Sequence, residues 1–276
     1  MTLQVEARPR GARATLKIRQ NVSQMSAAEV NRFRKAMQGL MERPDNRGYQ
    51  FFAGWHGVPL ELCIHHEPLF LPWHRGYLYF IELALQEIDP AVTLPWWDWM
   101  NEPGIPAAYD EKKAEGKANP LYSSAVEPMG VRRQPNWPKK TRREPGQPIP
   151  GVPAAVPPPL RGAYDWLMKA TSYEEFQQRC WRLHDNIHVW VGGPNGQMSD
   201  PLWAAFDPLF WAHHTMVDRL WRIWQHNNPG AVPDHWMLRE PMTFGKRPSL
   251  LVREVLDVKQ LGYEYAAQAS TVPGAG

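Results

Sequence analysis

The sequence predicts a mainly α-helical protein with long loops and minor β-structure. Apolar residues recur at helical intervals in four segments, and three of these begin with a capping residue or a first-turn proline. The most strand-like segment, TLPWWDW at 93–99, is interrupted by Pro95 and is typical of an edge or irregular element. At 276 residues, the chain is long enough to bury a substantial core.

The first helix is expected over 27–42, because Ser26 and Glu29 have the spacing of a capping box and apolar residues follow at helical intervals. An aromatic stretch then runs into His56. Gly57 comes directly after it, so His56 is expected near a helix end or on the following loop.

Two further helices are predicted from prolines. Pro72 is typical of a first helical turn and predicts a helix over about 72–88, with His74 in its first turn. Asp207 and the proline after it supply an N-cap and a first-turn residue for a helix over 208–224.

Residues 101–161 are expected to form a long loop within a single domain spanning 1–276. The proline run PGVPAAVPPPL and a basic patch favour extended loop over packed helix. The basic patch comprises Arg132, Arg133, Lys139, Lys140, Arg142 and Arg143. A solvated surface excursion is the simpler interpretation, but long loops in compact domains are often functional, so this one is also a candidate border of a site mouth or docking surface.

Composition argues against several classes of protein. The net charge of +3, without a basic run interleaved with stacking aromatics, does not indicate a nucleic-acid partner. Two cysteines allow at most one disulfide. No apolar run reaches the roughly 18 residues of a membrane span. The N-terminal segment has no apolar signal core, which predicts a cytoplasmic protein unless a partner exports it.

Eight of the ten histidines lie in two clusters that are far apart in the sequence. His184 and His188 belong to a helix expected over 173–189, where a spacing of four places both imidazoles on one face, about 6 Å apart along the axis. Helical spacing does not choose between His213 and His214. The clusters are His56, His65, His66 and His74, followed by His184, His188, His213 and His214.

The ligand types indicate copper. Neither cluster contains the cysteine pair of a structural zinc site, and the Glu-x-x-His pairs of diiron bundles are missing. Neutral imidazoles without carboxylates suit copper, the tightest binder among the divalent first-row ions. Two neighbouring copper ions would be suited to binding dioxygen or to two-electron oxidation.

Four motifs closely resemble the tyrosinase family of type 3 copper proteins, which includes polyphenol and catechol oxidases and molluscan hemocyanin domains. The segments RQNVSQMSAAEVNRF and VLDVKQLGYEY resemble the edges of that family, so the resemblance covers most of the chain. It implies an antiparallel four-helix bundle that holds a dicopper centre. The motifs are FLPWHRGYL at 70–78, LPWWDW at 94–99, HDNIHVWVGG at 184–193 and DPLFWAHHTMVDRLW at 207–221.

Carried over residue by residue, the resemblance implies two sets of copper ligands. His66 and His213 are left to pack against or orient the ligands. Asp218, one turn after His214, is a candidate for orienting a ligand imidazole, and the alternative is an ion pair with Arg222. The implied ligands are His56, His65 and His74 for the first copper ion and His184, His188 and His214 for the second.

Cys63 lies two residues before His65. Fungal tyrosinases and molluscan hemocyanins have a similar cysteine, joined to the ligand histidine by a thioether. The resemblance therefore implies a thioether between Cys63 and His65, and the alternative is an ordinary buried thiol.

The implied activity is oxidation of a small phenolic substrate to an o-quinone with dioxygen as co-substrate. The family often has an asparagine after the first ligand of the second copper, proposed to help a glutamate deprotonate monophenols. This chain has Asp185 there, and Glu175 is only a weak candidate for the glutamate because Cys180 occupies another expected position. An anionic Asp185 can act as a base or disfavour a phenolate, so oxidation of o-diphenols is expected ahead of monophenol hydroxylation.

Two other functions are compatible with the same motifs: an o-aminophenol oxidase of a biosynthetic pathway and, with less support, a hemocyanin-like oxygen-binding protein. The chain ends soon after LGYEYAAQ, which favours an enzyme with an open site over a carrier. Some bacterial relatives depend on a small partner for copper delivery and export, so a copper-delivery partner is a further candidate. No nucleic-acid or membrane partner is expected.

Overall fold

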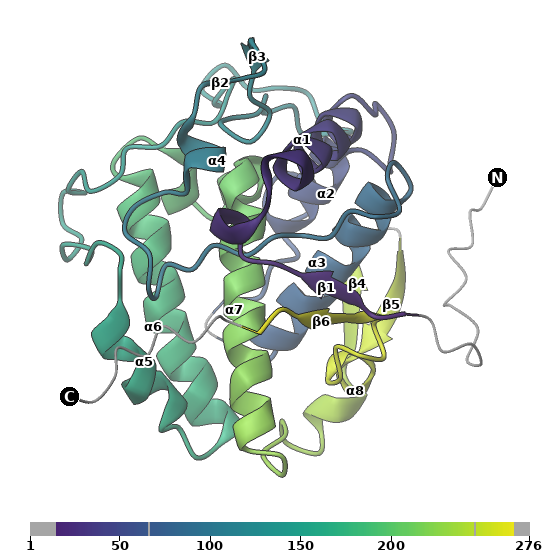
Figure 1. The fold of residues 1–276 in the computed structure, drawn as a ribbon, viewed down its shortest axis with the longest axis vertical. Helices are drawn as coiled ribbons and strands as arrows, with labels where there is room; N and C mark the ends of the chain where they lie inside the picture. The colour runs from purple at the N-terminus through teal and green to yellow at the C-terminus, as the bar shows by residue number, and fades with distance from the viewer. Residues whose placement is uncertain (1–14, 66, 246, 268–276) are drawn as a thin grey trace.

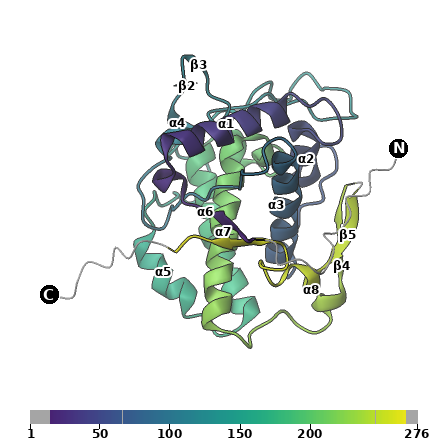
Figure 2. The same ribbon diagram turned by 45° about the vertical axis from the view of Figure 1, so that its right-hand side comes forward.

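Four helices carry the two histidine clusters or lead into them. The computed structural model describes residues 15–65, 67–245 and 247–267. In Figures 1 and 2, α7 stands upright at the centre with α6 on one side and α3 on the other. The four helices are α2 (Tyr49–His56), α3 (Phe70–Gln86), α6 (Tyr173–Gly192) and α7 (Pro208–Asn227).

Helix α7 runs antiparallel to α6. The ring of Phe176, near the start of α6, stacks on Trp224 near the end of α7 with centroids 4.8 Å apart. At the other end of the pair, His188 lies 5.9 Å from Phe210. The mostly helical fold and this packing agree with the predicted bundle.

Helix α7 is antiparallel to α3 as well. Tyr77 in α3 lies 4.8 Å from Trp211, early in α7, whereas Phe70 at the start of α3 lies 6.5 Å from His214 further along α7. Large aromatic side chains therefore fill the space between the helices, and the 14 tryptophans contribute several of the fully buried ones.

Helix α1 (Ala27–Met41) crosses one end of the upright helices and packs against α2 and α3 (Figure 2). Its predicted capping box is confirmed. The Ser26 hydroxyl accepts from the Glu29 backbone N–H at 3.3 Å, and the Glu29 carboxylate accepts from the Ser26 N–H at 2.8 Å. The first helix thus begins where its caps predict.

The other helix bounds differ from the predicted ones by a few residues. Helix α3 begins at Phe70, two residues before Pro72, so His74 lies one residue beyond the expected first turn. Pro72 still lies in that first turn, where its missing N–H breaks no helical hydrogen bond. His56 is the last residue of α2, as expected from Gly57.

The β-structure of the described residues is confined to short strand pairs. The segment 93–99 is irregular as predicted and holds only an isolated bridge from Trp96 to Asn21. Figure 1 shows β1 and β6 side by side across the front of the bundle. The pairs are β1 (Lys17–Arg19) with β6 (Tyr263–Tyr265), parallel, and two antiparallel pairs, β2 (Lys113–Ala114) with β3 (Lys117–Ala118) and β4 (Pro241–Phe244) with β5 (Arg247–Leu251).

The segment 101–160 contains α4 (Ala107–Asp110), β2 and β3 and otherwise runs as turns and loop. Its basic patch is not uniformly solvated. The Arg143 side chain is only 6% exposed and pairs with Asp207, the N-cap of α7, at 2.5 Å. This ion pair anchors the loop to the helix that carries His213 and His214.

The described residues also form two short helices, α5 (Arg161–Met168) and α8 (Val252–Val255).

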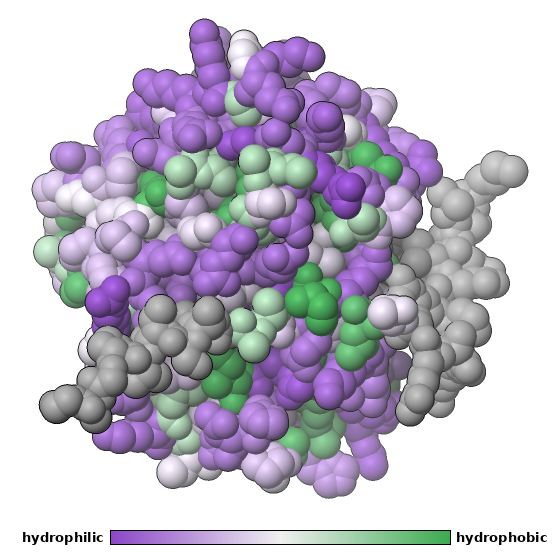
Figure 3. All heavy atoms as spheres, in the orientation of Figure 1, coloured by the Kyte–Doolittle hydropathy of each residue, from purple (hydrophilic) through white to green (hydrophobic). Residues whose placement is uncertain are grey.

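The face seen in Figure 3 is largely hydrophilic, with hydrophobic side chains scattered in small groups. No helix in the described part of the chain is long and apolar enough to cross a membrane.

Candidate metal centre

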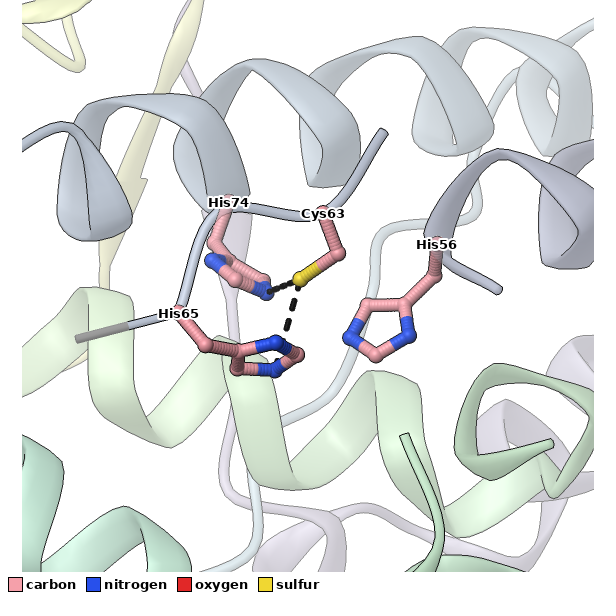
Figure 4. Close-up of side chains that lie close together, drawn as sticks. All are labelled: His56, Cys63, His65 and His74. Atoms are coloured by element: carbon pink, nitrogen blue, oxygen red, sulfur yellow. Dashed lines mark hydrogen bonds between the residues drawn. The ribbon is translucent and has the colours of Figure 1, made fainter. Parts of the chain in front are cut away.

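The first histidine cluster forms where α2 ends and α3 begins. His56 closes α2, His65 lies on the connecting loop, and His74 projects from α3 (Figure 4). Cys63 joins them from the same loop, with its Sγ 3.4 Å from Nε2 of His65 and 3.4 Å from Nε2 of His74. Each of the four residues offers one ligand atom, and these atoms lie within 4.8 Å of one another.

The second cluster lies between the antiparallel helices α6 and α7. The Nε2 atoms of His184 and His188 each lie 3.2 Å from Nε2 of His214. The predicted spacing of four on α6 therefore does bring both imidazoles to one point. The four ligand atoms of this cluster, counting His213, lie within 4.8 Å of one another.

The two clusters are direct neighbours. His74 stacks on His214, with ring centroids 4.4 Å apart and an interplanar angle of 11°. His65 and His184 lie 6.2 Å apart, centroid to centroid. Two metal ions held by these clusters would therefore share one site.

Hydrogen bonds at Nδ1 fix the orientation of four of these rings. Backbone carbonyls accept from three of them, because a carbonyl oxygen can only accept, and the proton is therefore on Nδ1. The lone pair is left on Nε2, which is the arrangement that a metal-binding histidine needs. The contacts are His56 to Pro201 O at 2.9 Å, His74 to Phe70 O at 2.8 Å, His188 to Met198 O at 2.7 Å, and His184 to the Asp185 carboxylate at 2.9 Å.

The Met198 and Pro201 carbonyls were not expected from the sequence. They come from the loop after α6, where PNGQMSDP shows only turn residues. No sequence pattern indicates which backbone carbonyl will face a histidine, so these two hydrogen-bond partners could not be predicted from the residue types.

Burial keeps the imidazoles neutral. Desolvation lowers the pKa of His56, His74, His188 and His214 well below the usual range, and the neighbouring histidines lower it further. A neutral imidazole is the form that binds a metal ion, so no proton has to be displaced.

The protein alone leaves these nitrogens poorly satisfied. His184 and His188 both present Nε2 lone pairs to His214, whose Nε2 can donate one hydrogen at most. Nε2 of His56 is buried and has no hydrogen-bond partner in the described structure. A cation in each cluster would satisfy these lone pairs, and imidazoles, with the Cys63 sulfur beside the first set, are donors that suit copper.

A hollow of about 290 Å³ reaches this centre from the surface. Four of the histidines form its floor, and its walls are mainly apolar. The lining residues are His56, His65, His184, Asp185, His188, Val189, Met198, Ser199, Pro201 and Ala204. A small planar molecule can therefore reach the imidazoles.

His213 lies beside the centre. Its ring stacks on His184 at 5.1 Å and meets His188 edge-on at 4.7 Å, and neither of its nitrogens has a hydrogen-bond partner among the described residues. His213 therefore packs against the other histidines of its cluster, as expected from the sequence. His66, the other spare histidine, lies outside the described residues.

The role expected for Asp218 is wrong. Its carboxylate does not contact a histidine, because it accepts from Arg75 Nε at 2.5 Å and from the hydroxyls of Tyr263 and Tyr265 at 2.7 and 2.5 Å. The alternative pairing with Arg222 is wrong too, since Arg222 pairs with Glu264 in β6. Asp218 instead ties α7 to α3 and to β6. Arg19 of β1 completes this buried cluster at 3.3 Å.

Asp185 lies at the site, whereas Glu175 does not. The Asp185 carboxylate holds His184 and lines the hollow, with its side chain 42% exposed. Glu175 lies ten residues before Asp185 on α6, about 15 Å along the axis at 1.5 Å per residue. Its carboxylate accepts from the Thr171 N–H at 2.7 Å and pairs with Arg179 at 2.5 Å, so its predicted part in proton handling is wrong.

Paired histidine clusters between antiparallel helices define a helical protein with a dinuclear metal centre, and comparison with known proteins gives its family. The family model of the common central domain of tyrosinase matches residues 46–227. The tyrosinase of Streptomyces glaucescens is 32% identical over 238 residues, which cover 78% of this chain and 84% of that protein. The chain therefore belongs to the tyrosinase family of type 3 copper proteins, and it is a tyrosinase-type oxidoreductase.

Hemocyanins are similar too. Hemocyanin 1 of Megathura crenulata is 29% identical over 230 residues, but the match spans 77% of this chain and only 7% of that much longer protein.

Solved structures of both kinds share the fold. Tyrosinase from Burkholderia thailandensis superposes with a TM-score of 0.78 at 22% identity, covering 94% of this chain and 76% of that one. Deoxygenated hemocyanin from Rapana thomasiana gives a TM-score of 0.77 at 24% identity, covering 92% and 70%.

Proposed function

We propose that this protein oxidises o-diphenols to o-quinones with dioxygen. The observation that carries the proposal is the hollow of about 290 Å³ whose floor is made of histidines from both clusters. A phenolic ring is small and planar enough to enter it and lie against the imidazoles. In this proposal His56, His65 and His74 hold one copper ion, and His184, His188 and His214 hold the other.

Bound copper would supply the redox chemistry, passing electrons from the substrate to dioxygen. Two o-diphenols each lose two electrons and two protons, and one dioxygen takes up four of each to give two waters. The chain's own residues hold the imidazoles in place and shape the hollow. The Val189, Met198 and Pro201 side chains give the substrate ring an apolar wall.

Asp185 is the residue best placed to handle a substrate proton. It lines the hollow and keeps part of its carboxylate in contact with solvent. A carboxylate at this position can accept a hydroxyl proton from a diphenol. The same negative charge disfavours a phenolate beside it, so hydroxylation of monophenols is expected to be slow.

The test is oxygen consumption by the copper-loaded protein with catechol, 2-aminophenol or tyrosine, with the metal-free protein as control. We expect fast turnover of catechol and slow turnover of tyrosine. Faster turnover of 2-aminophenol than of catechol would make the protein an aminophenol oxidase. Reversible oxygen binding without turnover of any substrate would make it an oxygen-binding protein.

A further inference from the structure

A second hollow, of about 550 Å³, lies beside the histidine hollow. The two share Ser199. The partition between them is the loop that follows α6. In the 3-10 turn Gln197–Ser199 of this loop, Gln197 lines the second hollow and Met198 lines the histidine hollow. The two hollows are therefore neighbours, with this turn between them.

The second hollow is basic. Lys139, Lys140 and Arg142 line it, against a single acidic lining residue, Asp200. The Asp200 carboxylate is already engaged by the Leu202 N–H at 2.9 Å. Within the described part of the chain, neither lysine forms an ion pair. The hollow thus presents positive charge that the protein does not neutralise.

These charges sit on an anchored segment of the long loop. The Lys139 carbonyl accepts from the Val126 N–H at 3.0 Å, and Lys140 forms a β-bridge with Ala125. Both lysine side chains are exposed, while their backbone is held in place. An anchored backbone keeps the two ammonium groups near the hollow, so their positive charge acts locally there.

Arg142 contributes a third, partly engaged charge. Its guanidinium is 58% exposed, lies 3.8 Å from Glu144 and donates to the Asn195 carbonyl at 2.9 Å. It therefore holds the partition loop as well as lining the hollow. For that reason Lys139 and Lys140 are the better residues for a test of charge alone.

On the basis of the proposed function, we infer that the preferred substrates are o-diphenols that carry an anionic arm, either a carboxylate or a phosphate. The ring lies over the histidines, and the arm passes Ser199 to reach Lys139, Lys140 and Arg142. The size of the hollow favours such a small molecule, because small-molecule sites commonly measure about 300–1,000 Å³. Charge on the arm adds attraction that a neutral diphenol lacks.

The kinetic test compares 3-(3,4-dihydroxyphenyl)propionate with neutral 4-methylcatechol. The variant Lys139→Glu/Lys140→Glu should lower kcat/KM for the propionate about tenfold, since each exposed charge is worth roughly threefold at high dielectric. Activity on 4-methylcatechol should not change. Lys112→Glu/Lys113→Glu is the matched control, because it makes the same change of charge at two exposed lysines that do not line the hollow. An unchanged ratio of the two substrates in the double variant overturns the inference.

A binding test does not depend on copper or turnover. Calorimetry of the metal-free protein should show about tenfold weaker binding of 3-phenylpropionate and of 2-phenylethyl phosphate to the double variant than to the natural protein. Tighter binding of one probe than the other would identify the preferred anion. Equal affinity of both proteins for both probes overturns the inference. Loss of turnover on 4-methylcatechol by the natural protein would instead count against the proposed function.

Discussion

The Nε2 atoms of His184 and His214 lie 3.2 Å apart, although the two residues belong to different helices and to sequence motifs of their own. Antiparallel packing of α6 on α7 brings them together. His213, the preceding residue, turns its ring onto the face of His184 instead. The structure thus separates two neighbouring histidines that helical spacing alone does not distinguish.

We predict that His214→Ala will lose one of the two copper ions, whereas His213→Phe will keep both. His214 aims its nitrogen at the other two histidines of its cluster, and His213 makes only ring contacts. Metal content measured after loading and desalting gives the answer. Equal copper loss in both variants would contradict this assignment.

The same His213→Phe variant should also stabilise the metal-free protein by about 1–2 kcal/mol, because it removes buried polar atoms without partners. Urea unfolding of the two metal-free proteins measures the difference. A lower stability of the variant would indicate that the His213 ring nitrogens do have a partner in solution.

Cys63 is expected to form a thioether with His65 once copper and dioxygen are supplied. Burial raises the pKa of Cys63, so in the metal-free protein the sulfur remains a thiol. The cross-link removes the thiol hydrogen and one ring hydrogen, with two electrons going to the oxidant. A mass loss of about 2 Da in the loaded protein, absent from Cys63→Ser and kept in Cys180→Ser, is the expected result.

Geometry alone does not choose the partner of Cys63, because His65 and His74 are equally close to its sulfur. Chymotryptic cleavage between Phe70 and Leu71 separates the two possibilities. A bond to His65 leaves the peptides on either side of this cut unlinked, and a bond to His74 holds them together. An unchanged mass with both peptides intact would leave Cys63 as an ordinary, partly buried thiol.

Asp218→Asn should destabilise the metal-free protein by about 3–5 kcal/mol at neutral pH, since it leaves the buried Arg75 with a neutral partner and leaves Arg19 with Glu82 alone. Glu264→Gln, which breaks the partly exposed pair with Arg222, is the control and should cost about 1 kcal/mol or less. Urea unfolding compares the two. Similar losses of unfolding free energy in both variants would mean that the buried Asp218 ion pairs contribute no more to stability than the exposed pair does.

The pH dependence of stability should differ as well. Burial alone would raise the pKa of Asp218, but the charges of Arg75 and Arg19 outweigh it and hold the pKa below its usual value. A lowered pKa in the folded state means that the contribution is complete above the ordinary carboxyl pKa of about 3.9 and is lost as the pH falls below it. Asp218→Asn should therefore flatten the loss of stability below about pH 4.

The helices and their caps were predictable because their causes are local. Ser26 and Glu29 are three residues apart, and His184 and His188 lie within one turn, so spacing alone fixes those relationships. The role of Asp218 was not predictable, because its partner Arg19 is 199 residues away and reaches it only through the pairing of β1 with β6.

The basic patch was also only partly predictable from the sequence. Its composition predicts solvent-exposed side chains. That prediction is right for Lys139 and Lys140 but wrong for Arg143, whose side chain pairs with Asp207 in the interior. Charge counts cannot tell an anchoring arginine from an exposed lysine when the partner lies 64 residues ahead. The position of the patch beside the histidine hollow emerged only from the fold.

Asp185 offers a test that separates holding a ligand from handling a proton. Its carboxylate fixes His184 through Nδ1, a contact that an amide oxygen can also make. We therefore expect Asp185→Asn to keep its copper affinity, and Asp185→Ala to lose about 10–100-fold, the usual effect of removing an outer partner of a ligand histidine. Competition with a copper chelator measures both.

Turnover then decides the second role. If the carboxylate accepts a proton from the diphenol, Asp185→Asn will bind copper normally and yet fall in kcat by about 100-fold or more, the usual contribution of a general base. A variant that keeps both copper and kcat would limit Asp185 to orienting His184. Because the asparagine variant retains the hydrogen bond and removes only the charge, a fall in kcat at full copper content can be assigned to the lost carboxylate.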